Sequence, residues 1–474
     1  MRSRIDLLKQ QLYLVLPPEQ IAALLDENDE MARKEIEEIL RRLTIARLPG
    51  QSRIVSRSER ERLISLTASE VLGLGVIDAL LEDESVTEIM VNGPSKIFFE
   101  REGKTLLSPD SYSSEEQLRM TIDRIISPLG RRIDEQNPMV NGRLAAGHRI
   151  NAVISPISLS GSLLTIRKFS ENTLSLADMT HSGSVNPAVA TLLAWAVSSA
   201  QNIAVSGGTG SGKTTILNAL SLEIPTSERI ITIEDSAELK FSTHPHVLRL
   251  EARPSNLEGK GEISVRDLVI NSLRMRPDRI VVGEVRGAEA LEMLQAMNTG
   301  HDGSLTTLHA NTPQEVVTRL ITMVGYGSDQ AQSQIEAQIA AALDLIVHVQ
   351  RCSDGVRRIV EITELSNLGF VNHCLENNNS QQTEPATGSN KSDQERQQIS
   401  GKISMKTLYF FEQTGTGDDG KVLGNHRFFN TPDFVDRLVA QNSITKAELS
   451  DWLTSAHLYS QSQIEDISKR EEAF

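Results

Sequence analysis

Apolar residues in the first 70 positions recur at the spacing of a helix. They lie three or four residues apart among many charged residues: Ile21, Leu24, Leu25, Ile36, Ile39, Leu40 and Leu43. This spacing predicts small amphipathic helices, because side chains three and four residues apart share one face of a helix. No chemical motif accompanies the pattern. We therefore expect residues 1–70 to form an N-terminal helical segment, an appendage without a catalytic role.

The pattern changes to short strand-like runs between residues 72 and 170. The runs are separated by Gly, Pro and Asn turns and interrupted by a helical stretch near residues 115–129: VTEIMVN, KIFFE, RINAVISPI and LLTIRKF. Alternation of this kind predicts a separate α+β domain over residues 72–170. The polar, turn-rich residues 171–186 that follow predict a hinge linker, before a helix that starts at Pro187.

Residues 187–370 contain four strongly apolar runs separated by helical stretches. Each run ends in glycine, acidic residues or histidine: QNIAVSG, RIITIED, DRIVVGE and SLTTLHA. Strands that are apolar throughout are typical of a parallel sheet covered on both faces. Functional residues in such sheets lie at the carboxyl ends of the strands. We therefore expect an α/β domain with its site at that edge.

The last quarter of the chain divides into two parts. Residues 376–398 contain no large apolar side chain, so burial cannot offset the entropy lost on ordering, and we expect a disordered polar loop over residues 371–402. The pattern returns in residues 403–474, with the strand-like run ISMKTLYFFEQ and helical stretches near residues 431–440 and 445–456. These residues predict a small accessory element.

Composition limits the classes of function. A chain of 474 residues is long enough for roughly three domains. Its net charge of −15 makes nucleic acid an unlikely partner, since that affinity rests on clustered Lys and Arg. The two cysteines, Cys352 and Cys374, support neither a disulfide framework nor a cysteine metal site. No apolar run approaches the roughly 20 residues that span a bilayer, so we expect a cytoplasmic protein that meets the membrane peripherally.

The sharpest motif is GGTGSGKT at residues 207–214, which fits G-x-x-x-x-G-K-[ST]. A β-branched run enters it and a helical run leaves it, which favours a phosphate-binding loop over a flexible glycine-rich turn. Backbone N–H groups of such a loop and the following helix N-terminus bind phosphates, Lys213 reaches the β and γ phosphates, and Thr214 offers a hydroxyl to Mg²⁺. We expect ATP to contact Gly207, Gly208, Thr209, Gly210, Ser211, Gly212, Lys213, Thr214 and Thr215.

Carboxylates end two of the apolar runs. Glu234 and Asp235 follow RIITI, and Glu284 follows DRIVVG. Both strand ends are expected beside the phosphate loop, where one carboxylate reaches Mg²⁺ through water and another polarises the attacking water. The residues alone do not decide which carboxylate reaches Mg²⁺ and which polarises the water. A standard Walker B motif ends in Asp, whereas this run offers Glu284 after a glycine.

Histidines bracket the fourth run. His301 and His309 flank SLTTL, and two histidines in this setting suggest contact with the γ phosphate or sensing of its loss, although a single histidine is more often structural.

Arginines are frequent before the loop and after it: Arg131, Arg132, Arg143, Arg149, Arg167, Arg266, Arg274, Arg276 and Arg286. As a group they suggest positive charge for a phosphoryl group, although any single surface arginine is more often solvated or paired. The stretch RRIDEQNPMVNGRLAAGHRI could deliver this charge from another domain or subunit.

Four motifs in order resemble those of a known family. GGTGSGKTT, ITIEDSAEL, RMRPDRIVVGEVRG and NTGHDGSLTTLHANT are similar to the Walker A, Asp box, Walker B and His box of the type II and type IV secretion and type IV pilus ATPases. Further segments resemble the tight-adherence (Flp/Tad, CpaF-like) pilus assembly ATPases: SPLGRRIDEQNPMVNGRL, RPSNLEGKGEISVRDLVINSLRMRPDRI and FFEQTGTGDDGKVLG. The resemblance covers residues 72 to about 365 and the piece at 410–424, but not the polar loop.

This resemblance implies an architecture and a set of roles. The fold would be α/β: a RecA-like P-loop NTPase domain over residues 187–370, preceded by the smaller α+β domain and the helical segment. Glu234 would be the general base, Glu284 the Walker B carboxylate near Mg²⁺, and His301 and His309 γ-phosphate sensors. Arg143 and Arg149 would be the first candidates among arginines that reach phosphate from the N-terminal domain.

The same resemblance implies the setting. The chain would form a homohexamer that hydrolyses MgATP and works with integral inner-membrane platform proteins in Flp/Tad-type pilus assembly or protein secretion. Two alternatives remain: a type IV secretion ATPase that moves DNA or effectors, and a nucleotide-gated scaffold with little turnover. The retention of Lys213, Thr214, Glu234 and Glu284 argues against the scaffold, since a protein that only binds nucleotide needs no water-activating acid.

Overall fold

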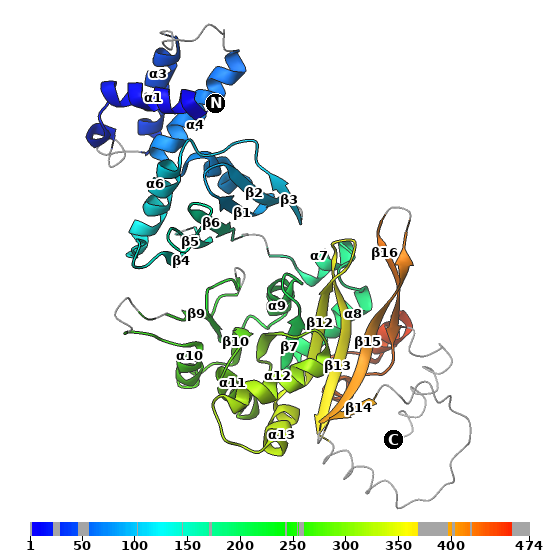
Figure 1. The fold of residues 1–474 in the computed structure, drawn as a ribbon. Helices are drawn as coiled ribbons and strands as arrows, with labels where there is room; N and C mark the ends of the chain where they lie inside the picture. Colours follow the sequence, from blue (N-terminus) through cyan, green and yellow to red (C-terminus); the bar gives the residue numbers. More distant parts are fainter. Residues whose placement is uncertain are drawn as a thin grey trace, which may run out of the picture. The chain divides into compact units, whose positions relative to one another are not determined.

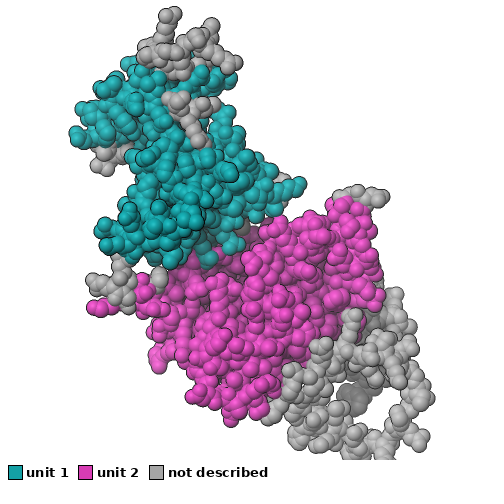
Figure 2. Space-filling model, in the orientation of Figure 1, with its two compact units in different colours: residues 1–171 teal, residues 172–474 magenta. Residues whose placement is uncertain are grey.

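The computed structural model divides into two compact units, residues 1–171 and 172–474 (Figure 2). It describes residues 2–21, 29–45, 56–101, 103–144, 146–169, 173–241, 244–253, 255, 260–367, 397–400, 403–417 and 420–456. Among these residues no single helix is both long and apolar enough to cross a membrane, and the helices at Arg57–Leu72 and Gly75–Glu82 meet that test only as a pair bent by 110°.

Three helices open the first unit: α1 (Arg2–Val15), α3 (Asp29–Ile45) and α4 (Arg57–Leu72) (Figure 1). Their apolar stripes meet in one cluster that buries Leu8, Leu12 and Ile36. Helix α4 begins where the Ser56 side chain accepts a hydrogen bond from the Glu59 N–H, which satisfies a donor of the first turn. The sequence prediction of an N-terminal helical segment is confirmed.

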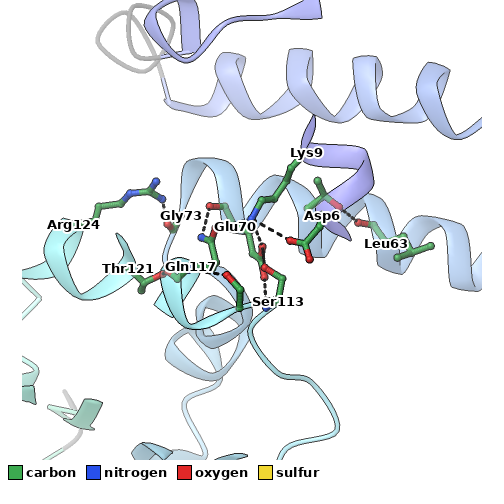
Figure 3. A network of polar contacts seen from close by, with 11 residues as sticks. Asp6, Lys9, Leu63, Glu70, Gly73, Ser113, Gln117, Thr121 and Arg124 are labelled. Carbon is green, nitrogen blue, oxygen red and sulfur yellow. Dashed lines mark hydrogen bonds and ion pairs between the residues drawn. The ribbon is translucent and has the colours of Figure 1, made fainter. Parts of the chain in front are cut away.

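A buried polar network ties these helices to the rest of the unit (Figure 3). The Lys9 amine on α1 lies 2.9 Å from a Glu70 carboxylate oxygen on α4 and 2.6 Å from the Gln117 amide oxygen on α6 (Glu115–Ile126). The Glu70 side chain is fully buried and also accepts hydrogen bonds from the Ser113 N–H and hydroxyl. The helical segment is therefore held by specific contacts, which the expectation of an appendage did not foresee.

The first unit contains a six-stranded sheet in the order β3-β2-β1-β6-β5-β4, with antiparallel neighbours. Residues of one face, such as Ile89, Ile150 and Leu164, share an apolar cluster with Leu118 and Ile122 of α6. The strands are β1 (Val86–Asn92), β2 (Lys96–Arg101), β3 (Lys104–Leu107), β4 (Met139–Arg143), β5 (Arg149–Val153) and β6 (Leu163–Arg167).

The second unit is built on a ten-stranded sheet whose main path is β14-β15-β13-β12-β7-β11-β10-β8-β9, with β16 paired to β15. Neighbours from β12 to β9 are parallel. The four apolar runs of the sequence are β7 (Ile203–Gly207), β8 (Ile230–Glu234), β10 (Arg279–Val285) and β11 (Leu305–His309), and the other two parallel strands are β9 (Val247–Glu251) and β12 (Leu345–Arg351). The predicted parallel sheet is confirmed.

Helices cover both faces of this sheet, so central strands such as β7 and β8 are buried on both sides. One face packs with α7 (Leu176–His181), α8 (Pro187–Ser198) and α9 (Lys213–Ser221). The other packs with α10 (Val265–Ser272), α11 (Glu289–Asn298), α12 (Pro313–Gly325) and α13 (Gln332–Ala342). Adjacent residues Ile203 and Ala204 of β7 belong to the two different clusters, as the alternation of a strand requires.

The C-terminal residues differ from their prediction as an accessory element, because they complete the core of the second unit. The Trp452 indole N–H donates to the Ala188 carbonyl at 2.8 Å, and Phe434 and Trp452 share the cluster of α8. A strand shows its pairing partner only after folding, so the sequence did not reveal this role. The elements are β13 (Arg357–Asn367), β15 (Ile403–Thr416), β16 (Val422–Phe428), α15 (Asp433–Ala440) and α16 (Lys446–Ser455).

Two predicted connecting segments also differ in part. The expected hinge at 171–186 contains α7, whose Ser175 and Asp178 form a capping box. The expected disordered loop at 371–402 lies outside the described residues except for Gln397–Ser400, which form β14 and pair with β15. Backbone hydrogen bonding to a neighbouring strand does not depend on apolar side chains, so a segment of mainly polar residues can join the sheet.

Candidate active site

The segment between β7 and α9 forms a tight loop that requires glycine at defined positions. A Cβ atom on Gly207 would overlap the Val349 carbonyl oxygen and lie 2.5 Å from the Ser211 hydroxyl. Gly210 and Gly212 have φ values of 69° and 97°, in the left-handed region that residues with a side chain rarely adopt. The loop conformation is therefore specified by its glycines. Thr209 and Gly210 lie exposed at its tip.

The loop and the start of α9 carry groups that can bind a polyphosphate. The Lys213 amine donates to the carbonyls of Gly207 and Gly208, at 3.0 Å each. Burial lowers the pKa of Lys213, the Glu284 carboxylate opposes this effect, and Arg286 adds to it. Thr214 and Thr215 lie in the first turn of α9, whose N–H groups find no acceptor within the helix. Backbone donors and an ammonium group thus surround one small space.

Glu234 ends β8 and is buried, with 4% of its surface exposed. One carboxylate oxygen accepts hydrogen bonds from the N–H groups of Glu238 and Leu239, at 2.7 and 2.9 Å. The other oxygen is buried with no hydrogen-bond partner among the described residues. Burial raises the pKa of Glu234, although the two N–H bonds oppose the shift. One oxygen is anchored and the other is available, which is the arrangement that a general base needs.

Gly283 explains the glycine that separates Glu284 from the strand DRIVV. Strand β10 pairs with β8 so that Val282 lies beside Ile233, and the next residues are Gly283 and Glu234. A Cβ atom on Gly283 would lie 2.8 Å from Cγ of Glu234. Glycine is therefore needed here to seat the Glu234 side chain. The sequence reasoning noted this glycine only as a departure from the usual motif.

Glu284 lies in a more open position than Glu234. Its carboxylate pairs with the Arg286 guanidinium, which also lies 3.6 Å from an Asp235 oxygen. The Thr307 hydroxyl donates to the Gly283 carbonyl at 2.7 Å and ties β11 to this turn. The sequence places Arg286 among nine candidate arginines and assigns it no individual role. The structure makes it the partner of Glu284.

The residues available for Mg²⁺ fit an ion shared with nucleotide phosphates. The described residues contain no group of three or more His, Cys, Asp or Glu side chains that could hold a metal by themselves. Mg²⁺ in phosphoryl-transfer sites takes one or two protein oxygens and completes its shell with phosphates and water. The Thr214 hydroxyl and the Glu284 carboxylate are oxygen donors of the required kind.

The structure separates the two histidines that the sequence had grouped. His309 ends β11 and lies in register with Gly207, the first residue of the loop. His301 precedes β11, at the amino end of the strand, with its Nδ1 3.3 Å from the Ala296 carbonyl. A strand advances about 3.3 Å per residue, so the five residues of β11 hold these ends far apart. Within one chain His301 and the phosphate loop therefore lie at opposite ends of β11, and the role of His301 as a γ-phosphate sensor stays a prediction.

A third histidine, which the sequence reasoning missed, lies beside the loop. His348 on β12 is buried, and its Nδ1 lies 2.9 Å from the hydroxyl of Ser206, the residue before Gly207. Burial lowers the pKa of His348, and the Lys213 charge adds to the shift. A cavity of about 210 Å³ adjoins it, lined in part by Asn311 and Gln350. The sequence signal was a lone polar residue inside the apolar run LIVHV.

Three arginines of the first unit lie in a row across neighbouring strands. Arg143 is paired with Arg149 across β4 and β5, and Arg149 with Arg167 across β5 and β6, so all three belong to one face. The row places three positive charges on one face, and Arg167 also lies opposite Glu88 across β1 and β6. The Arg143 guanidinium also lies 5.8 Å from the centre of the Phe169 ring. The expectation that Arg143 and Arg149 reach phosphate remains a prediction, since they and the phosphate loop belong to different units.

Comparisons with known proteins agree on one family. Residues 70–413 match the family described as "Type II/IV secretion system protein". A putative conjugal transfer protein of Mycobacterium tuberculosis is 39% identical over 304 residues, which are 63% of this chain and 86% of that protein. The conjugal transfer protein TrbB of Rhizobium radiobacter is 34% identical over 297 residues, 62% of this chain and 87% of that one.

A solved structure is also similar. The VirB11 ATPase of the Brucella suis type IV secretion system, in complex with sulphate, is 29% identical and covers 60% of this chain and 95% of its own, with a TM-score of 0.34.

Proposed function

Because this chain belongs to the type II/IV secretion system protein family and is an ATPase, we propose that it is a motor that couples MgATP hydrolysis to movement at a membrane. The observation that carries this proposal is the meeting of three groups at one sheet edge. They are the phosphate loop with Lys213, the half-anchored carboxylate of Glu234, and Glu284 beside them. A protein that only binds nucleotide would need the phosphate loop but neither carboxylate.

In the proposed reaction the loop N–H groups and the start of α9 bind the phosphates, and Lys213 neutralises charge on the β and γ groups. Thr214 and Glu284 would hold Mg²⁺, which supplies charge neutralisation and orientation of the phosphates. Glu234 accepts a proton from the attacking water through its second oxygen, while its first oxygen stays fixed by the N–H groups of Glu238 and Leu239. The products are ADP and phosphate.

Other residues are proposed to respond to the nucleotide. His309 lies in register beside Gly207 and would contact the γ phosphate or respond to its loss. Arg143 and Arg149 would supply positive charge to the phosphoryl group, which requires the first unit of the same or a neighbouring chain to close on the loop. A homohexameric ring is the proposed assembly, in which turnover moves one unit against the other.

The proposed task is assembly of a Flp/Tad-type pilus or export of protein at the inner membrane, from the cytoplasmic side and through integral platform proteins. The segments similar to the tight-adherence pilus ATPases support it. The alternative is a type IV secretion ATPase that moves DNA or effectors, and the conjugal transfer relatives favour it. The net charge of −15 speaks against direct contact with DNA.

The test compares the steady-state ATPase activity and oligomeric mass of the wild type with those of Glu284→Gln. The variant should keep nucleotide binding and lose turnover. Glu251→Gln serves as the matched control, because Glu251 is an exposed carboxylate at the end of β9, beside Glu234 in register. An active hexamer inactivated by Glu284→Gln alone supports the motor. Normal turnover by Glu284→Gln overturns the assignment, and a monomer that binds ATP without turnover favours the gated scaffold.

A further inference from the structure

An exposed arginine far along the chain contacts the phosphate loop. Arg357 begins β13, and its Nε donates to the carbonyl of Gly210 at 2.9 Å. Its side-chain stem packs so closely on Gly212 that a Cβ atom there would lie 3.0 Å from Cδ of Arg357. The Arg357 side chain therefore contacts the loop at both Gly212 and Gly210. None of the sequence motifs includes this residue.

The hairpin that carries Arg357 is firmly held. Arg358 and Asp354 form two hydrogen bonds of 2.8 Å, and Asp354 also accepts from the N–H groups of Val356 and Val422. These contacts lower the pKa of Asp354, with the Arg358 hydrogen bond as the main cause. The turn is thereby fixed to β16. These hydrogen bonds hold the turn before β13 in one position, and a residue that positions a binding loop needs such a fixed support.

The contact fixes the direction of one peptide group. In a planar trans peptide the carbonyl and the N–H point in opposite directions. Because the Gly210 carbonyl points to Arg357, the Ser211 N–H of the same peptide points away from Arg357, toward the Gly208 carbonyl. There it lies 3.4 Å from the Gly208 carbonyl oxygen, longer than an ordinary hydrogen bond. This N–H is therefore available to a stronger acceptor such as a phosphate oxygen.

We propose that Arg357 is a positioning residue for nucleotide binding, which holds the Gly210–Ser211 peptide with its N–H directed at the phosphates. The inference rests on the proposed function, since it assumes that the loop binds a nucleotide. The contact concerns the loop and not Glu234, so it supports binding of ADP and ATP alike and contributes little to the chemical step. A guanidinium hydrogen bond of this kind is worth roughly a tenfold change in affinity.

The experiment uses two substitutions of nearly equal length in the full chain. Arg357→Gln places an amide N–H where the arginine has Nε, without the charge, whereas Arg357→Met fills the same space without a donor. Binding of fluorescent ADP and of a non-hydrolysable ATP analogue is measured together with KM, kcat and the unfolding temperature of the nucleotide-free protein. Arg351→Gln, an exposed arginine of the same hairpin, is the control.

We expect Arg357→Met to weaken binding of both nucleotides about tenfold, with kcat and the unfolding temperature nearly unchanged. Arg357→Gln should restore the affinity to within about threefold. Wild-type affinity in Arg357→Met overturns the inference, and so does an Arg357→Gln as weak as Arg357→Met, which would indicate direct charge contact. A wild type that binds no nucleotide would instead refute the proposed function.

Discussion

The two sheets of this chain organise their charged residues in different ways. In the second unit the parallel strands β7, β8 and β10 end at one edge, so Lys213, Glu234 and Glu284 meet there although they are far apart in sequence. In the first unit the strands are antiparallel, and Arg143, Arg149 and Arg167 form a row on one face, with Arg167 exposed. Parallel topology concentrates and buries unlike groups, whereas the antiparallel sheet displays like charges near the surface.

The comparison has a measurable consequence. A buried group with fixed partners has no substitute, so its loss should remove a function almost completely. A row of similar charges near water shares its task, so the loss of one member should reduce the function in part and depend on salt.

The largest effect is expected from Lys213→Ala. The Lys213 amine donates to the Gly207 and Gly208 carbonyls of the loop, so its positive charge lies where phosphates would bind. We expect kcat/KM for ATP to fall by about 1000-fold, with a matching loss of nucleotide affinity. Steady-state ATPase assays and fluorescent-nucleotide titration measure both. Lys96→Ala, at an exposed lysine of the first unit, should leave them unchanged. Unchanged nucleotide affinity in Lys213→Ala would count against the loop as the binding site.

Glu234→Gln should separate binding from chemistry. The amide keeps the shape of the side chain but cannot take a proton, so we expect kcat to fall about 100- to 1000-fold while the affinity for ATP stays within a few-fold of the wild type. Single-turnover kinetics with bound ATP measure the chemical step. An equal loss in affinity and kcat would contradict a role as base and would indicate a disturbed loop.

The pH dependence of kcat gives an independent check on Glu234. A base acts only when ionised, and burial raises the pKa of Glu234. The rate should therefore decline with falling pH at a value above the ordinary glutamate pKa of about 4.3. The residual activity of Glu234→Gln should lack this decline. A decline that persists in the variant would assign it to another group.

Glu364 tests whether a buried carboxylate of the same sheet, away from the loop, affects stability instead of catalysis. Burial raises its pKa to about 7, and Asp433 adds to the shift. Its folded pKa is above its unfolded one, so its stabilising effect is complete below the unfolded value of about 4.5 and is lost as the pH rises to about 7. The loss is at most about 3 kcal/mol.

Denaturant unfolding between pH 5 and pH 8 measures this effect as the difference between the wild type and Glu364→Gln. The variant should lack this part of the pH dependence and retain its ATPase activity. Parallel stability curves for the two proteins would show that Glu364 is ionised throughout.

The smallest effect is expected in the arginine row. Arg149→Ala should lower kcat/KM about tenfold, and the loss should shrink at high salt, because the charges lie near water. The free energy of unfolding should change by no more than about 0.5 kcal/mol, because Arg149 is only partly buried. ATPase assays at two salt concentrations, with Arg57→Ala as an exposed control, test this. A complete loss of turnover that salt does not alter would place Arg149 with the irreplaceable groups.

Much of the fold could be read from patterns that are local. The runs that form β7, β8, β10 and β11 are rich in apolar and β-branched residues, and the phosphate loop is marked by glycines whose φ values only glycine adopts readily. The roles of Gly283 and Arg357 could not be read, because each depends on a neighbour that is distant in sequence. The separation of His301 from the loop along β11 could not be read for a related reason, because residues that are near in the chain can lie at opposite ends of a strand.

The sequence by itself determined the phosphate loop, the parallel core and the acids at its strand ends, since glycine conformation, apolar periodicity and strand length act over a few residues. The tertiary structure alone decided which groups meet. In the folded chain Glu234 packs against Gly283, and Arg357 donates a hydrogen bond to Gly210. The C-terminal Trp452 lies in the core beside α8. The physical reason is that burial, close approach and hydrogen-bond partners between distant segments exist only once the sheet has assembled.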